Sequence, residues 1–313
     1  MSWLSIASAS SNDCSRHLNG VRHEIRLSDE IPLNRRPLFI AAEAKVQGLV
    51  HNLMLLPPLS FEITDLPGVV GGFAYFGENK IKLTRSSLLL SDAALEDLLI
   101  HEITHFIVAK TFFVRDPRFA AFTLHEFFQA ILANENPGQH LYDVISANAI
   151  HAPYAELVCD VASIILNRNP SSFADIFHEF YANAENDPET QEFLDSTMVD
   201  RPFELSSRDF SVHHEDPRWH KYEPRHSVYN RFNQIRSYLW HRWIKDLPAE
   251  QAPQFFSNLL YFIEFLYRTE RLDQLTYLIG VKNANVALIE LMEASLRTDG
   301  PIDQSFLNRH SHP

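Results

Sequence analysis

The sequence predicts an α+β fold: a small mixed β-sheet with an edge hairpin packs on one long helix, and a mainly helical C-terminal lobe follows. Two β-prone runs around a glycine-containing turn at residues 71–84 indicate the hairpin. A strongly helical stretch follows at 91–107, and helical periodicity returns from 229 to 296. With 313 residues, 45% of them hydrophobic, the chain can bury one large core or two smaller ones.

The first part of the chain supplies the remaining elements of this sheet. Residues 21–27 alternate between polar and apolar side chains, as a half-buried strand does, and residues 60–65 are read as another strand. A helix is predicted at 37–56 between these two strands. Further helices are predicted at 118–133 and 140–150.

The long helix is predicted to carry two histidines on its polar side. Ser91 is its N-cap, and Asp92 lies in the first turn, where an acidic side chain is favourable. His101 and His105 are four residues apart, so they lie above one another on the helix. They face away from the centre of an apolar arc formed by Leu95, Leu99, Ile100, Ile103, Phe106 and Ile107. Such a helix can bury one face while two imidazoles line a cleft.

The pentad His101-Glu102-Ile103-Thr104-His105 has the spacing of a metal site. Two imidazole nitrogens at this spacing can bind one ion, and Glu102 can reach a water molecule on that ion. The pattern predicts one zinc ion, with Glu102 as the general base. The simpler interpretation is that both histidines are ordinary helix residues that bind no metal.

A catalytic zinc site usually takes a third protein ligand and a water molecule. Glu156 and Asp160 are one turn apart on a predicted helix whose first turn contains Pro153. Glu156 can ligate the ion, while Asp160 accepts the free ring N–H of a ligand histidine. Alternatively, the two carboxylates form an ordinary solvated or salt-bridged pair. The rival third ligands are His125, His140 and His151.

The pentad followed by Glu156-x-x-x-Asp160 resembles the gluzincins, the thermolysin-like branch of the zinc peptidases. The resemblance covers residues 36–166 and depends on five polar positions. It implies a zincin-like fold in which the first strand of the hairpin forms the edge of the active-site cleft. That edge would bind an extended substrate by main-chain hydrogen bonds, through Phe73, Ala74 and Tyr75.

The resemblance also implies that a helical lobe at 225–300 completes the cleft and supplies a donor for the oxyanion. His226 is the first candidate for this donor and Tyr229 the second, and Arg236 is a third, substrate-binding candidate. Alternatively, these residues are ordinary polar residues between domains. A second histidine-rich segment, 212–216 with His220 nearby, has a spacing that suits an extra metal but is more simply a solvated acidic loop.

The predicted function is zinc-dependent hydrolysis of peptide bonds in a peptide or protein substrate. In this hypothesis Glu102 takes a proton from the attacking water and passes it to the leaving nitrogen. The alternative is a zincin-fold binding or regulatory protein with no hydrolytic activity. A third possibility is a structural zinc ion with four protein ligands and no open position.

Charge and composition argue against several classes of partner. The formal net charge of −13 argues against nucleic acid or an anionic membrane as the main partner. No apolar run is long enough to span a membrane. The two cysteines, Cys14 and Cys159, do not make a disulfide framework. We expect a cytoplasmic location, with export through an N-terminal signal as the alternative.

Five segments are expected along the chain. The polar stretch in the middle is rich in Asp, Glu, Pro and His and therefore predicts a connection between two folded parts. In chain order the segments are a disordered lead-in (1–20), a zincin-like catalytic domain (21–182), the polar connection (183–224), the helical lobe (225–300) and a tail (301–313).

Overall fold

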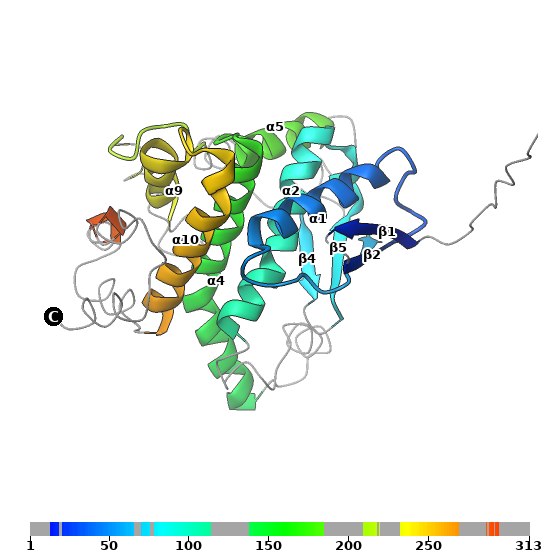
Figure 1. Ribbon diagram of the computed structural model, residues 1–313, viewed down its shortest axis with the longest axis horizontal. Coiled ribbons are helices and arrows are strands. Elements are labelled where there is room, and N and C mark those ends of the chain that lie inside the picture. Colours follow the sequence, from blue (N-terminus) through cyan, green and yellow to red (C-terminus); the bar gives the residue numbers. More distant parts are fainter. Residues whose placement is uncertain are drawn as a thin grey trace, which may run out of the picture.

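The described residues form a mixed β-sheet of five strands in the order β1-β2-β3-β5-β4, with helices packed against it (Figure 1). The predicted α+β class and the small mixed sheet are confirmed. The computed structural model describes residues 13–18, 21–65, 70–75, 78–113, 138–184, 209–217, 219, 232–268, 286, 288–290 and 292–293. The strands are β1 (Asp13–Leu18), β2 (Val21–Leu27), β3 (Ser60–Thr64), β4 (Gly72–Tyr75) and β5 (Lys80–Thr84).

The two outer strands of the sheet run antiparallel to their neighbours. The inner strands β2, β3 and β5 are parallel, whereas β1 pairs antiparallel with β2, and β4 with β5. The prediction of a disordered lead-in at 1–20 is wrong for residues 13–18, which form β1. This segment is polar and shows little alternation, so it gave no strand signal; main-chain pairing with β2 orders it instead.

The predicted hairpin is confirmed as β4 and β5, and it lies at one edge of the sheet. Asn79 adopts a left-handed conformation (φ 50°) at the turn, which suits asparagine. Lys80 at the start of β5 pairs with both Glu62 and Glu78, at 2.9 Å each. Within the described part of the chain, no strand pairs with the outer side of β4.

Helices cover one face of this sheet. Phe39 contacts the Phe61 ring of β3 edge-on, with centroids 5.2 Å apart, and Leu83 of β5 lies in the same buried layer. Figure 1 shows α1 and α2 over the strands and the long helix α4 beside α10. The helices are α1 (Arg36–Val50), α2 (Asp92–Val108), α4 (Gly138–Asn167), α5 (Ser172–Ala184), α9 (Asn233–Leu239) and α10 (Ala252–Arg268), with π-helical turns at η2 (Ala109–Phe113) and η3 (Trp240–Ile244) and 3-10 turns at η1 (Arg85–Leu89) and η4 (Ala249–Gln251).

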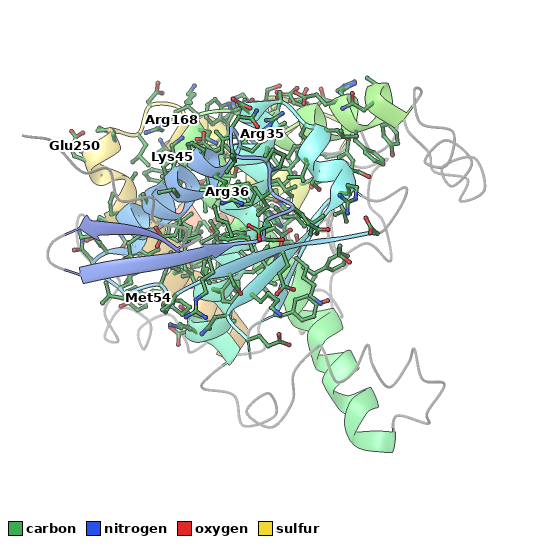
Figure 2. All side chains as sticks on the ribbon, turned by 90° about the vertical axis from the view of Figure 1, so that its right-hand side faces the viewer. Arg35, Arg36, Lys45, Met54, Arg168 and Glu250 are labelled. Atoms are coloured by element: carbon green, nitrogen blue, oxygen red, sulfur yellow. The ribbon has the colours of Figure 1, made fainter. Side chains whose placement is uncertain are left out.

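Helix α4 corrects the prediction of two separate helices at 140–150 and after Pro153. It is continuous from Gly138 to Asn167, with Pro153 in its interior. Proline lacks the N–H for the helical hydrogen bond and usually ends or kinks a helix. Here the following turns are held by burial of Leu157, Val158 and Val161, whose packing outweighs the local cost. The first turns of α4 extend beyond the other elements in both views (Figures 1 and 2).

The C-terminal helices belong to the same hydrophobic core as the sheet. This cluster includes Phe61 of β3, Ile103 of α2, Val161 of α4 and Phe256 of α10. Arg168, just after α4, donates hydrogen bonds to the carbonyls of Ile244 and Leu247 and so ties α4 to the end of η3. Figure 2 labels Arg168 and, on α1, Lys45, whose Nζ lies 2.8 Å from Asn167 Oδ1. The division of the chain into two lobes stays a prediction.

Two further predictions concern the chain after α4. The polar connection expected at 183–224 begins one residue before the end of α5, and residues 209–217 within it are described without helix or strand. Helix α5 itself was not predicted. Among the helices that the structure describes, none combines the length and apolar character needed to cross a membrane.

Candidate metal centre

The candidate site lies between two antiparallel helices, α2 and α4. Ser91 caps α2 as predicted, because its Oγ accepts a hydrogen bond from the Ala94 N–H. Along the helix pair, polar side chains meet one turn after another: Asp97 meets Ser163, His101 meets Asp160, and His105 meets Glu156. The helix spacing of three to four residues repeats on both partners and therefore aligns these three contacts.

His101, His105 and Glu156 place three ligand atoms close together. His101 Nε2 lies 3.2 Å from His105 Nε2 and 3.2 Å from Glu156 Oε2, and His105 Nε2 lies 3.7 Å from Glu156 Oε1. Ligands at zinc distances of about 2.0–2.2 Å in a tetrahedron are about 3.4 Å from one another. The separations and the donor types in this structure therefore suit one bound metal ion.

Asp160 holds His101 in the orientation that metal binding needs. Its Oδ1 lies 3.0 Å from His101 Nδ1, the ring nitrogen that points away from the ligand cluster. A carboxylate on this nitrogen fixes the tautomer so that Nε2 is free to bind a metal. Arg236 Nε on α9 lies 2.6 Å from Asp160 Oδ2, and both side chains are fully buried. Asp160 thus bridges the ligand helix and the C-terminal helices.

The two histidines have opposite pKa shifts. Burial lowers the pKa of His101, but the carboxylates of Asp160 and Glu156, 3.0 and 3.2 Å from its two ring nitrogens, outweigh burial and raise that pKa to about 10. Burial, together with the nearby His101, lowers the pKa of His105 to about 4. Without a metal, one proton on His101 therefore balances the carboxylates, and His105 stays neutral. A divalent cation bound between Nε2 of both rings and Glu156 would replace that proton.

Glu102 lies beside the candidate ligands and packs against Gly72 of β4. Its side chain is only 5% exposed. Burial, with the charge of Glu156, raises its pKa to about 7, while His101 and a main-chain hydrogen bond from Gly72 lower it. A carboxylate whose pKa is near neutrality can both take and give a proton at physiological pH.

Cys159 is a buried neighbour of the two histidines. Ligand atoms of His101, His105 and Cys159 all lie within 4.8 Å of one another. Burial and the charges of Glu156, Asp160 and Glu102 raise the pKa of the Cys159 thiol well above its usual range. The thiol is therefore neutral without a metal. Its position three residues after Glu156 was the sequence signal for its place on the same helix face.

The predicted edge residues lie on β4, next to the ligand helix. Phe73 is 37% exposed, and Ala74 and Tyr75 are half-buried. In the antiparallel ladder the main chain of Gly71 bonds toward β5, since its carbonyl accepts from the Thr84 N–H at 3.1 Å. Main-chain groups alternate in direction along a strand, so those of Gly72 and Ala74 point outward from the sheet edge. The N–H and carbonyl of Ala74 and the carbonyl of Gly72 are therefore the hydrogen-bonding groups of this edge, whereas the Gly72 N–H donates to Glu102.

The remaining predicted site residues are placed as follows. His226 and Tyr229, the first two oxyanion candidates, lie outside the described residues, as do His125 and the side chains of His140 and His151. Arg236 is described and lies behind Asp160, a structural position that the sequence did not indicate. Its predicted contact with a substrate stays a prediction.

The second histidine-rich segment contacts Ser237 of α9 and His241 of η3. The rings of His213 and His214 have centroids 4.3 Å apart, and His241 of η3 lies 5.2 Å from His213. Among the described residues, the groups whose ligand atoms converge for a metal are both built around His101 instead. The segment is anchored to the C-terminal helices by Ser237, which donates to the Val212 carbonyl, and by His241, whose Nε2 lies 2.8 Å from the Ser211 carbonyl.

Asp97, one turn before His101, is expected to make the free energy of unfolding depend on pH. Burial raises its pKa to about 6, although hydrogen bonds from Ser163 and Asn167 oppose the shift. The unfolded chain releases this proton near its ordinary value of 3.8, so the folded state is favoured below that value and loses the advantage as the pH rises through about 6. Relative to Asp97→Asn, the wild type should lose about 3 kcal/mol of unfolding free energy between acid and neutral pH. Urea unfolding of wild type and Asp97→Asn between acid and neutral pH measures this loss. If the unfolding free energies of the two proteins changed with pH in parallel, the prediction would be contradicted.

Comparison with protein-family models, with curated proteins and with solved structures finds no match to this chain. The functional conclusion therefore depends on the residues of the site.

Proposed function

We propose that the protein is a zinc-dependent hydrolase of peptide bonds, with His101, His105 and Glu156 as the zinc ligands. The observation that supports this most is the spacing of 3.2, 3.2 and 3.7 Å among their ligand atoms, which suits one tetrahedral ion. With three protein ligands, the site keeps a position for water, as catalytic zinc sites do. When bound there, zinc would lower the pKa of water and polarise a carbonyl group.

The protein's own residues transfer the proton and orient a zinc ligand. Glu102, buried beside the three ligands, takes a proton from the attacking water and gives it to the leaving nitrogen. Asp160 keeps the His101 ring oriented through Nδ1, and Arg236 holds Asp160 in turn. The buried surroundings of Glu102 exclude competing water from the carboxylate and strengthen its interactions with charge.

The edge of β4, which pairs with no further strand among the described residues, supports a peptide as the substrate class. An extended peptide can add to this edge through the outward N–H and carbonyl of Ala74 and the outward carbonyl of Gly72. Since Gly72 also lies against Glu102, a peptide on the edge would pass directly beside the general base. Exposed Phe73 leaves an apolar side chain near the same edge.

Zinc content is the first test of this proposal. We expect one zinc per wild-type chain after exhaustive dialysis, because three ligand atoms already converge. His105→Ala and Glu156→Ala should each lose the ion or bind it much more weakly, since each removes one of three ligands. Elemental analysis of the dialysed proteins measures this, with circular dichroism to confirm folding.

The matched control is His51→Ala, which removes an exposed histidine at the end of α1. It should keep its zinc. Zinc retained in Glu156→Ala would contradict Glu156 as the third ligand, and a wild type that binds no added zinc would refute the proposed function.

A further inference from the structure

The closest approach of β4 to α2 occurs at Gly72 and Glu102. A Cβ atom added to Gly72 would lie 2.6 Å from Glu102 Cγ and 2.7 Å from Glu102 Cδ. It would also lie 3.0 Å from Leu83 Cδ2. Contacts below 3.0 Å do not occur for real Cβ atoms, and Glu102 is buried and has little room to move. Only glycine at position 72 therefore allows Glu102 its observed position.

The start of β4 is fixed by a clamp on the preceding residue, Gly71. Its N–H donates to Ser87 Oγ at 3.0 Å, and Ser87 Oγ donates to the Gly71 carbonyl at 3.1 Å. The main-chain N–H of Thr84 also donates to the Gly71 carbonyl, at 3.1 Å, and Thr84 Oγ1 lies 2.8 Å from Ser87 Oγ. Thr84 and Ser87 are both fully buried, so water does not compete for these bonds. Gly71 has φ 152°, a conformation that favours glycine.

The clamp determines the direction in which Gly72 faces. Because the main chain of Gly71 bonds toward β5 and η1, the N–H of the next residue turns away from them. The absent side chain of Gly72 points to the helix-covered face, where Glu102 lies. The two consecutive glycines therefore have separate functions. Gly71 forms the hydrogen bonds with Ser87 and Thr84, and Gly72 leaves space for the side chain of Glu102.

We infer that Gly72 is a positioning residue for the general base, held in place by the clamp of Thr84 and Ser87 on Gly71. The inference rests on the proposed function for its catalytic meaning. In this inference β4 has two roles: it would bind the peptide along its edge, and through Gly72 it sets the position of the Glu102 carboxylate. A displacement of about 1 Å of a reacting group can lower the rate about a hundred-fold. A change in the contact between Gly72 and Glu102 is therefore expected to have a large effect on kcat.

The first experiment needs no activity. The urea midpoints of wild type, Gly72→Ala, Glu102→Ala and the double variant form a thermodynamic cycle, measured on the full chain. We expect Gly72→Ala to lower the midpoint clearly in wild type and much less in the Glu102→Ala background, because the new methyl group then has space. Equal shifts in the two backgrounds would overturn the inference.

The second experiment measures the catalytic consequence in the zinc-loaded protein, with a library peptide that the wild type cleaves. Gly72→Ala should lower kcat about a hundred-fold, while KM and zinc content stay unchanged. In Gly72→Ala/Glu102→Asp, the shorter acid makes room for the methyl group. The step from Glu102→Asp to this double variant should therefore cost far less than Gly72→Ala costs in wild type. An unchanged kcat in Gly72→Ala would overturn the inference.

The matched control is Gly48→Ala on α1, where an added Cβ meets no atom within 4 Å. It should keep kcat and show an equal or higher urea midpoint, since alanine favours a helix over glycine. The two proposals fail in distinguishable ways. A wild type without zinc or turnover refutes the proposed function, whereas the stability cycle still decides whether Gly72 acts through Glu102.

Discussion

Glu102→Gln is expected to lower kcat by about a hundred- to ten-thousand-fold while the protein stays folded and keeps its zinc. The amide has nearly the shape of the carboxylate, so it fits between α2 and Gly72, but it does not accept a proton. Glu102 is not one of the three ligand residues, and its loss leaves the contacts of His101 and Glu156 intact. Steady-state kinetics on a cleaved peptide, with elemental analysis of the same sample, measures both quantities.

The control for this variant is Glu96→Gln on the same helix. Glu96 forms an ion pair with Lys45 at 2.8 Å, outside the ligand cluster, and its replacement should leave kcat unchanged. Full activity in Glu102→Gln would contradict the general-base assignment. Lost zinc in that variant would instead show that Glu102 contributes to metal binding, which the proposed roles exclude.

Much of the candidate site could be predicted because it obeys local helix rules. His101 and His105 share a helix side through their spacing of four residues, as Glu156 and Asp160 do. The N-cap at Ser91 and the hairpin before α2 also follow from short patterns, and the structure confirms both. What the sequence left open was which later residue joins the two histidines. That choice depends on how α2 and α4 cross, and a local pattern carries no such information.

Three features escaped prediction because they arise from contacts between distant segments. The continuity of α4 through Pro153 depends on tertiary packing of the turns that follow, which overrides the local preference of proline. The pairing of Arg236 with Asp160 joins residues 76 positions apart. The role of Gly72 is visible only when β4 lies against α2, since a glycine pair beside a strand is otherwise read as turn chemistry.

The Asp160–Arg236 pair carries the second large effect, on stability. Arg236→Met keeps most of the side-chain volume but removes the cation, and Asp160 then remains as a buried carboxylate beside His101. Breaking a buried ion pair by removing one partner costs about 3–5 kcal/mol, because the remaining charge is not solvated. We expect a loss of this size in the unfolding free energy of the zinc-free protein, measured in urea. Zinc affinity should fall about ten-fold, since Asp160 would orient His101 less firmly.

A matched surface pair separates burial from the loss of charge itself. Arg85 Nε lies 2.6 Å from Asp65 Oδ1, the same atom types and distance as in the buried pair, but the side chains are 56% and 74% exposed. Arg85→Met should therefore leave stability close to that of wild type, because water solvates the remaining carboxylate. The double variant Arg236→Met/Asp160→Asn should be more stable than Arg236→Met alone, since it removes the stranded charge. If Arg85→Met and Arg236→Met destabilised the protein equally, burial would not be the cause, and the link from the C-terminal helices through Asp160 to His101 would lose its energetic basis.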